Sequence, residues 1–333
     1  MFDELTPDTG PITKPTSVVA VRCGTGPTIP MVHRSPETVV VLNPESGSGT
    51  HGAAVRSHAA ALGYTLTETG PDIDATTAAR AAAERGVSTV VAAGGDGTVN
   101  EVVRGLRRAD ALDRVTLGVV PVGTGNSFAK RLAVPDIDTA FDAIESGERC
   151  RVDLGQANGR VFVNSCVAGL TADASSRTST AMKRRLGVLA YVVTTLRTVP
   201  AFESLRLTVS VDGRDSSGPV WTGDALTVLV GNGRRFTPNR GQQANLEDGL
   251  FDVAVVEAVP VHSLLSETLF ERLLGRESDY IDRFRARSLS IEVHHPETVR
   301  FSLDGEIIQA RSLSVRNRPR ALSVAVGEGY TPA

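Results

Sequence analysis

Cysteine is scarce in this 333-residue chain, and the few cysteines present form no cluster. Cys23, Cys150 and Cys166 are widely spaced, and no Cys-x-x-Cys pair occurs. The six histidines likewise form no His-Glu-x-x-His or His-x-x-x-His pattern. These absences argue against a disulfide framework and against a zinc site, and they are typical of proteins from a reducing compartment.

Long apolar runs are also missing. No stretch approaches the ~20 apolar residues that a membrane-spanning helix needs, and the N-terminus lacks the basic and then apolar pattern of a secretory signal. The formal net charge is −3 at pH 7. The chain as a whole therefore does not attract nucleic acid or an anionic membrane, and any such attraction would be local. We expect a cytoplasmic protein that has no nucleic-acid partner.

The length of the chain suits two domains. Residues 1–37 are rich in Pro, Thr and Gly and are predicted to form a flexible extension. Residues 38–148 alternate between β-branched runs and segments of helical composition, which predicts an α/β domain with a parallel sheet covered on both faces. The expected strands are 38–42, 64–69, 87–93 and 116–120, and the expected helices are 52–62, 75–85, 99–108 and 127–132.

Beyond residue 148 the pattern changes to strand-like segments that are separated by turns. They predict a β-rich, antiparallel, sandwich-like domain over residues 149–327, whose C-terminal end would be free to pack back on the first domain. The hairpin signals are Asp212-Gly213 and Asp304-Gly305. The expected strands are 151–163, 204–211, 224–230, 251–256, 288–293 and 299–303, and two helical stretches, 180–199 and 261–274, interrupt them.

The most informative motif is Gly94-Gly95-Asp96-Gly97-Thr98-Val99-Asn100-Glu101, which follows an apolar strand and leads into a predicted helix. Its glycines let backbone N–H groups approach a ligand closely, and the helix start adds unpaired N–H donors that suit a phosphate. Asp96 is the unusual member, because a carboxylate beside a phosphate is repulsive unless a metal ion or a transferred proton stands between them. The motif points to phosphoryl transfer, against the plainer interpretation of a glycine-rich strand-to-helix turn.

Two further glycine-rich loops follow predicted strands. They are Asn43-Pro44-Glu45-Ser46-Gly47 and Gly123-Thr124-Gly125-Asn126. Because ligand loops of a parallel sheet cluster at the carboxyl ends of its strands, the three loops are expected to line one nucleotide groove.

Other nucleotide-binding motifs fit less well. The stretch from Gly47 to Gly52 is a formal Gly-x-Gly-x-x-Gly, and Glu68 ends the next strand, which together are the fingerprint of a dinucleotide-binding dehydrogenase. No candidate hydride-transfer constellation accompanies it. A P-loop NTPase is excluded because Gly-x-x-x-x-Gly-Lys-Ser/Thr does not occur.

Acidic residues gather around glycines in the second half of the chain, in the segment from Asn245 to Asp252 and in Leu303-Asp304-Gly305-Glu306. Turn chemistry alone explains such clusters. Acids combined with main-chain carbonyls also form hard-cation sites that suit Mg²⁺. A carboxylate that faces the nucleotide loops would in addition serve as a general base toward an acceptor hydroxyl. These residues alone leave the interpretations open.

Taken in order, these motifs resemble a known family. Asn43-Pro-x-Ser-Gly47, Gly94-Gly-Asp-Gly-Thr-Val-Asn-Glu101, Pro121-x-Gly-Thr-Gly-Asn126, Asp248-Gly-Leu-Phe-Asp252 and Leu303-Asp-Gly-Glu306 are similar to motifs of the diacylglycerol kinase catalytic-domain family. The likeness is to its soluble bacterial-type lipid kinases, which resemble sphingosine and ceramide kinases, and it covers residues 38–327. Gly-Gly-Asp-Gly-Thr alone is shared with NAD kinases and phosphofructokinases, so the two later motifs make the resemblance specific.

The resemblance implies cofactors, a substrate and roles for the matching positions. The expected cofactors are ATP and Mg²⁺, and the expected substrate is a lipid alcohol. ATP would lie against Asn43, Pro44, Glu45, Ser46, Gly47, Thr69, Gly94, Gly95, Asp96, Gly97, Thr98, Val99, Asn100, Glu101 and Thr124. Mg²⁺ would be bound by Asp248 with main-chain oxygens near Asn245 and Leu250. Glu306 would accept the proton of the lipid hydroxyl, and Asp304 and Asp96 would organise catalytic Mg²⁺ and water.

Two positions depart from the family pattern. Ser48 stands where the family often has a basic residue, so one phosphate contact is missing. Ser127 stands where an Asp is common, and this leaves Asp153 as a substitute in the metal-and-water network. These departures keep a second hypothesis open, in which the chain is a catalytically silent nucleotide- or lipid-binding module. A third hypothesis is an NAD kinase-like enzyme with a soluble substrate.

The lipid side of the resemblance concerns the stretch 180–199, which begins with Lys183, Arg184 and Arg185 and continues with apolar residues on one face. Such a helix would rest on an anionic membrane surface or form part of an acyl-chain entry, or it would simply pack on the β-rich domain. The expected localisation is therefore cytoplasmic, with peripheral membrane association as one interpretation. An exposed sheet edge in the second domain would offer a surface for a homodimer.

Overall fold

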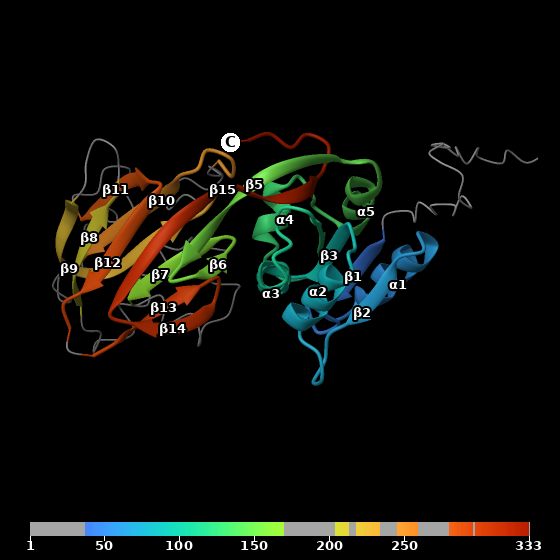
Figure 1. Cartoon of the computed structure of the whole chain (residues 1–333), viewed down its shortest axis with the longest axis horizontal. Coiled ribbons are helices and arrows are strands. Elements are labelled where there is room, and N and C mark those ends of the chain that lie inside the picture. The colour runs from blue at the N-terminus through green and yellow to red at the C-terminus, as the bar shows by residue number, and fades with distance from the viewer. Residues whose placement is uncertain are drawn as a thin grey trace, which may run out of the picture. The chain divides into compact units, whose positions relative to one another are not determined.

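The structure is a computed structural model, and it describes residues 37–169, 204–212, 218–233, 245–258, 280–295 and 297–332. The two helices expected at 180–199 and 261–274, and residues 1–36 of the expected extension, lie outside these ranges. Within the described residues, the strands join into one 15-stranded sheet (Figure 1). No helix there is long and apolar enough to cross a membrane.

The N-terminal part of the sheet is parallel. Strands β1 (Thr38–Leu42), β2 (Thr65–Glu68), β3 (Thr89–Gly94) and β4 (Thr116–Pro121) are adjacent in the order β4-β3-β1-β2. All three pairings are parallel. Every residue of β3 is buried, as expected for a central strand covered on both faces. The predicted α/β domain with a parallel sheet is confirmed.

Five helices accompany these strands in the described part of the chain: α1 (Gly52–Ala61), α2 (Ala75–Glu84), α3 (Asp96–Arg108), α4 (Ser127–Arg131) and α5 (Ile137–Ser146). Figure 1 shows them gathered around β1, β2 and β3. Helix α2 contacts α3, and α1 contacts α5. Helix α3 starts at Asp96, three residues before the expected start, so Gly97 and Thr98 belong to its first turn rather than to a loop.

Helix α5 was not expected from the sequence, although its signals are present. The Asp136 carboxylate accepts the N–H of Thr139 at 2.8 Å and caps the helix start. The apolar residues Ala140, Phe141 and Ile144 recur at helical spacing and are buried.

The second half of the sheet is largely antiparallel, and the prediction of a β-rich domain is confirmed. Its described strands are β5 (Glu148–Ala157), β6 (Arg160–Phe162), β7 (Ser165–Gly169), β8 (Leu205–Val211), β9 (Gly218–Gly231), β10 (Phe251–Glu257), β11 (Ile281–Ala286), β12 (Ser288–Val293), β13 (Val299–Leu303), β14 (Glu306–Ala310) and β15 (Ser312–Val326).

Several boundaries differ from the expectation. The single strand expected over 151–163 is wrong: it is the antiparallel hairpin β5–β6, which turns at Asn158-Gly159 with both residues at positive φ. Strands β7, β11, β14 and β15 were not expected. The predicted turn at Asp304-Gly305 does join β13 to β14, because Leu303 pairs with Glu306 directly across it.

Strand β15 connects the two halves of the sheet. It runs antiparallel to β12 and β5, and its residues Ser323 and Val324 pair in parallel with Thr116 and Leu117 of β4. An irregularity interrupts its pairing with β5 between Arg318 and Leu322. The chain therefore returns to the parallel strands with β15, the last of the described strands.

A stacked pair of phenylalanines lies at the centre of the β-rich part. Phe162 and Phe251 are fully buried, and their ring centroids are 5.8 Å apart. We expect Phe251→Ala to lower the free energy of unfolding by about 3–5 kcal/mol, because it removes apolar contacts and leaves a cavity. Val220→Ala is the matched control, since Val220 is 48% exposed on β9, and it should cost no more than about 0.5 kcal/mol. Urea unfolding measures both, and equal effects would contradict the packing described here.

Candidate active site

Three glycine-rich loops meet at the carboxyl ends of β1, β3 and β4. A Cβ atom on Gly123 would lie 2.2 Å from the Cα of Gly95, and a Cβ atom on Gly47 would lie 2.3 Å from the carbonyl oxygen of Val122. Gly47 also has a φ of +68°, which side chains rarely adopt. Only glycine fits at these contacts, so the backbones of the three loops touch, as the parallel sheet predicts.

Asn43 links the first loop to the second. Its side-chain Nδ2 donates to the hydroxyl of Thr98 at 3.3 Å, and its Oδ1 accepts the N–H of Glu45 at 3.0 Å. The Asn-Pro-x-Ser-Gly loop is thus held against the first turn of α3. Ser48, which stands where a basic residue is frequent, forms a 2.7 Å hydrogen bond with the hydroxyl of Thr50.

The start of α3 leaves backbone donors available to a ligand. Gly95 occupies the N-cap position, and no side chain caps the helix there. Uncapped N–H groups at a helix start, with the positive end of the helix dipole, suit an anion. Val99 and Asn100 are only 2% and 4% exposed, so their side chains face the core. Within this motif Gly97 is exposed, and Gly95, Asp96 and Glu101 are half-buried.

Asp96 has a contact that its motif did not suggest. Its Oδ1 accepts the N–H of Phe128 at 2.9 Å, and its Oδ2 accepts the N–H of Ser127 at 3.0 Å. The carboxylate therefore satisfies the first N–H groups of α4 and attaches this helix to the loop after β3. No local sequence signal connects residues so far apart.

Asp304 occupies the β13–β14 turn with a φ of +50°. Its carboxylate accepts N–H groups from Val163 at 2.6 Å, Asn164 at 2.9 Å and Ser165 at 2.8 Å. Burial raises the pKa of this carboxyl to about 6, the charge of nearby Asp96 adds to the rise, and the three hydrogen bonds oppose it. The turn is thus attached to the segment between β6 and β7, and it lies near the Asp96 carboxylate.

Glu306 begins β14 and lies between two arginines. Its Oε2 is 2.7 Å from Arg104 Nη1 on α3, and its Oε1 is 2.7 Å from Arg160 Nη1 on β6. The Glu306 side chain is 29% exposed, so it is reachable from solvent. One turn before Arg104, burial raises the pKa of Glu101, and the charges of Asp74 and Glu306 add to that rise. Sequence analysis missed Arg104 and Arg160, because neither belongs to a motif.

The acidic loop at 245–252 forms a second cluster. The Oδ1 of Asp248 accepts the N–H of Leu250 at 2.9 Å, and its Oδ2 forms an ion pair with Arg285. The Asn245 side chain accepts the N–H of Glu247 at 2.8 Å. Among the described residues, no group of three or more His, Cys, Asp and Glu side chains is placed to bind a metal ion.

Asp153 supports this loop from β5. Its carboxylate is buried and accepts the N–H of Gly249 at 2.6 Å and the N–H of Arg320 at 2.8 Å. Burial raises the pKa of Asp153, and the nearby Asp248 charge contributes to the rise. The carboxylates of Asp153 and Asp248 are therefore neighbours, and they bring several oxygen atoms close together.

Thr69 and Thr124 lie beside the loops. The N–H of Thr69 donates to the carbonyl of Leu42 at 2.8 Å, which keeps it at the end of β1. Thr124 is exposed in the loop after β4. Glu68, the acidic residue of the dinucleotide interpretation, instead forms a 2.6 Å ion pair with Arg56 on α1.

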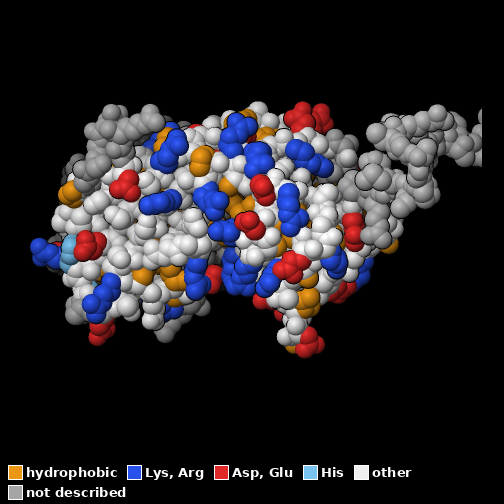
Figure 2. Space-filling view, viewed as in Figure 1, with side chains coloured by type: hydrophobic (Ala, Val, Ile, Leu, Met, Phe, Trp, Pro, Cys, Tyr) orange, Lys and Arg blue, Asp and Glu red, His pale blue; other side chains and the backbone are white. Residues whose placement is uncertain are grey.

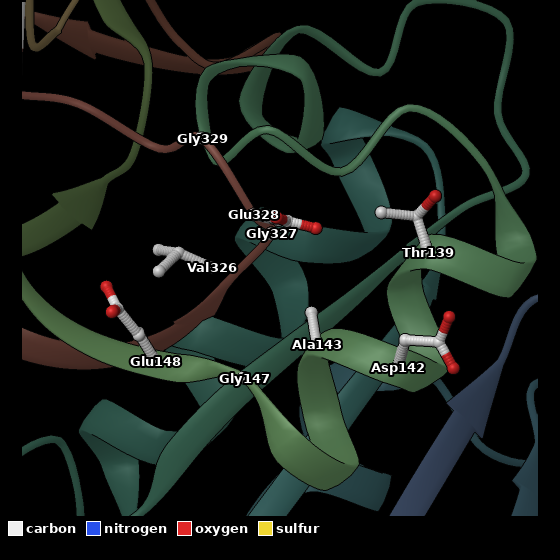
Figure 3. Close-up of a pocket in the computed structure, with 9 residues that line it drawn as sticks. All are labelled: Thr139, Asp142, Ala143, Gly147, Glu148, Val326, Gly327, Glu328 and Gly329. Carbon is white, nitrogen blue, oxygen red and sulfur yellow. The ribbon is translucent and has the colours of Figure 1, made fainter.

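One pocket of about 570 Å³ lies away from these motifs, beside α5 and the end of β15. Figure 3 shows the carboxylates of Asp142 and Glu148 on opposite sides of Ala143, so they do not converge on one point. None of the motif residues lines this pocket.

Comparisons with known proteins agree with the motif pattern. The family model described as "Diacylglycerol kinase catalytic domain" matches residues 37–157. A second model, "YegS C-terminal NAD kinase beta sandwich-like domain", matches residues 164–326.

Curated relatives and a solved structure extend this match. The chain is 33% identical to "Diacylglycerol kinase" of Bacillus subtilis over 239 residues, which are 70% of this chain and 76% of that protein. It is 30% identical to "Probable lipid kinase YegS-like" of Pectobacterium atrosepticum over 87% of this chain and 96% of that protein. A solved structure from Bacillus anthracis str. Sterne aligns with a TM-score of 0.70 at 24% identity, over 91% of this chain and 100% of the other. This structural likeness concerns the fold alone.

From the raised pKa of Asp304 we predict how the free energy of unfolding changes with pH. Because the folded-state pKa of about 6 lies above the ordinary 3.8, the group stabilises the fold fully below pH 3.8 and loses that contribution as pH rises through 6. Urea unfolding of the wild type and of Asp304→Asn should therefore give a difference in free energy of unfolding, wild type minus variant, that falls between about pH 4 and about pH 6. A pH-independent difference would contradict the burial argument.

Proposed function

We propose that this chain, which belongs to the diacylglycerol kinase catalytic-domain family, transfers the γ-phosphate of ATP to the hydroxyl group of a lipid. One observation supports this activity above the others. The turn that carries Asp304 and Glu306 lies against α3, whose first turn meets the glycine-rich loops, because Glu306 pairs with Arg104 and Asp304 lies near Asp96. ATP bound at the glycine-rich loops, as the phosphate donor, would therefore lie next to Glu306, the proton acceptor.

The glycine-rich loops suit the phosphates of ATP. The contacts of Gly47 and Gly123 leave a surface of backbone atoms without bulky side chains, and the uncapped start of α3 offers N–H donors. Backbone donors of this kind stabilise charge on phosphate oxygens without reorganising. Asn43 and Thr98 hold the first loop in place.

Glu306 is the proposed proton acceptor. Each carboxylate oxygen carries two lone pairs, and each oxygen of Glu306 contacts one guanidinium group. One lone pair on each oxygen is thus left for a substrate hydroxyl, while Arg104 and Arg160 fix the orientation of the carboxylate. In the proposed step, the lipid hydroxyl gives its proton to Glu306 as its oxygen bonds to the γ-phosphorus, and the bond to the β-phosphate oxygen breaks to release ADP.

The donor atoms present fit Mg²⁺, which prefers oxygen ligands. Burial raises the pKa of Asp304 and of Asp153, and the charge of a neighbouring carboxylate adds to each rise, Asp96 beside Asp304 and Asp248 beside Asp153. A cation at either place would relieve this repulsion. Asp248 with the carbonyls near Asn245 and Leu250 would bind one Mg²⁺, and Asp96 and Asp304 would organise a catalytic ion. When bound, the ion supplies neutralisation of phosphate charge.

The other hypotheses receive less support. An NAD kinase-like enzyme would share the Gly-Gly-Asp-Gly turn, but the curated relatives above carry lipid kinase names. A catalytically silent module would follow from Ser48 and Ser127. The N–H of Ser127, however, already donates to Asp96, so this position retains a link to the proposed site without an acidic side chain. The membrane-binding proposal rests on the resemblance and on the stretch 180–199, which lies outside the described residues. The dimer proposal rests on an exposed sheet edge in the β-rich domain.

The first test replaces Glu306 by Gln. We expect kcat for phosphoryl transfer to fall by about 10²–10⁴-fold, because the amide cannot accept the proton. Purified protein is incubated with γ-labelled ATP, Mg²⁺ and a lipid extract from the source organism, and the labelled lipid is separated and identified by mass. Glu292→Gln on β12 is the matched control, since Glu292 is exposed. Near-normal turnover in Glu306→Gln, with unchanged thermal unfolding, would remove Glu306 from the proposed role.

The second test concerns the metal. We expect Asp248→Asn to raise the Mg²⁺ concentration needed for half-maximal transfer by about tenfold or more, since a charged ligand becomes a neutral one. Asp282→Asn on β11 is the control, because Asp282 is exposed and forms no part of the proposed site. Mg²⁺ titrations of the rate measure this effect. Identical Mg²⁺ dependence in the two variants would place the ion elsewhere.

A further inference from the structure

A second pocket of about 570 Å³ is rich in arginine. It lies between the end of α3, the segment that follows α3, and the irregular part of β15. The charged side chains that line it are Arg107, Asp110, Asp113, Arg151, Arg318 and Arg320. Four arginines and two aspartates therefore line this pocket, and Figure 2 shows basic side chains gathered over the region where β5, β15 and α3 lie. None of the proposed nucleotide or metal residues lines this pocket.

The carboxylates neutralise little of this positive charge. Asp110 is 99% exposed and lies 3.6 Å from Arg107 Nη1, so the pair is weakened by solvent. Arg151 donates to the carbonyl of Arg320 at 2.8 Å and more weakly to that of Asp113 at 3.4 Å. Among the described residues, the side chains of Arg318 and Arg320 form no ion pair. The pocket thus has an excess of guanidinium donors without anionic partners.

One arginine of this pocket is incompletely bonded within the fold. Among the described residues, the Nε of Arg107 is inaccessible to solvent and has no hydrogen-bond partner. A buried polar atom left unpaired is costly. Asn317 also lines the pocket, but its side-chain Nδ2 donates to the Oδ1 of Asn232 in the interior at 3.4 Å.

Hydrogen bonds hold the backbone that forms one wall of the pocket. Arg320 has a φ of +50°, and its N–H is bound by the buried carboxylate of Asp153 at 2.8 Å. Arg151 holds the carbonyl of the same residue. The backbone that presents Arg318 and Arg320 is therefore held from two sides, which prepares the site before a ligand arrives.

We propose that this pocket binds a phosphate group, either that of a soluble phosphomonoester or that of a glycerophospholipid headgroup. Guanidinium groups match the oxygens of phosphate and form charge-assisted bonds with them. The volume lies within the range of small-ligand sites. Arg107 follows Asp96 by eleven positions on α3, which is ~16 Å along the helix axis, so the site is distinct from the glycine-rich loops.

The test compares two double variants of equal charge. Arg107→Gln/Arg318→Gln removes two pocket arginines from α3 and β15. Arg108→Gln/Arg316→Gln removes two exposed arginines from the same elements, and neither lines the pocket. Binding of glycerol 3-phosphate is measured by calorimetry, and binding to phosphatidylglycerol vesicles is measured by sedimentation against neutral phosphatidylcholine vesicles.

We expect the pocket variant to bind one of these probes about tenfold or more weakly than the wild type, while the control variant binds it within about twofold. Loss confined to glycerol 3-phosphate would identify a soluble ligand, and loss confined to vesicles would identify a lipid headgroup. No binding of either probe by the wild type, or equal binding by both variants, would overturn the proposal. If the pocket variant has a lower thermal midpoint, Arg318→Gln alone is compared with Arg316→Gln on the same criteria.

Discussion

The candidate site depends on one buried carboxylate, that of Asp304. It accepts three backbone N–H groups from the segment between β6 and β7 and holds the β13–β14 turn in a left-handed conformation. This turn places Glu306 opposite Arg104 on α3. The pairing of β13 with β7 and the ion pair between Arg160 and Glu306 add to the Asp304 contacts at this end of the site.

A second buried carboxylate, that of Asp153, binds backbone N–H groups in the same way at the acidic loop 245–252. Asp153 accepts N–H groups from Gly249 and Arg320 and so joins three distant segments. Asp96 likewise binds the start of α4. At Asp304 and Asp153, backbone N–H groups stabilise the negative charge that burial penalises. Acids that the sequence marked as candidates for chemistry therefore also hold the backbone together, and a substitution at any of them affects both.

The sequence was informative where local chemistry determines structure. Glycines after β-branched strands predicted the convergence of the loops at one sheet edge, and Asp304-Gly305 predicted its hairpin. It was uninformative where pairing is long-range: β15 contains Pro319, and its neighbour β4 is about 200 residues earlier in the chain. Arg104 and Arg160 were missed for the same reason, since only the folded chain brings them to Glu306. Helix α5 is a different case, because its N-cap residue and the spacing of its apolar residues can both be read from the sequence.

The position of β15 in the sheet has a consequence for biosynthesis. Residues 323 and 324 complete the hydrogen bonding of β4, whose own residues are near 116. The ribosome therefore makes β1 to β4 and their glycine-rich loops long before it makes β15, the strand that pairs with the open edge of β4. An uncovered strand edge invites pairing with other chains, and contacts this remote in sequence form slowly. The nascent chain thus remains exposed to association at the edge of β4 until residues 323 and 324 have been made.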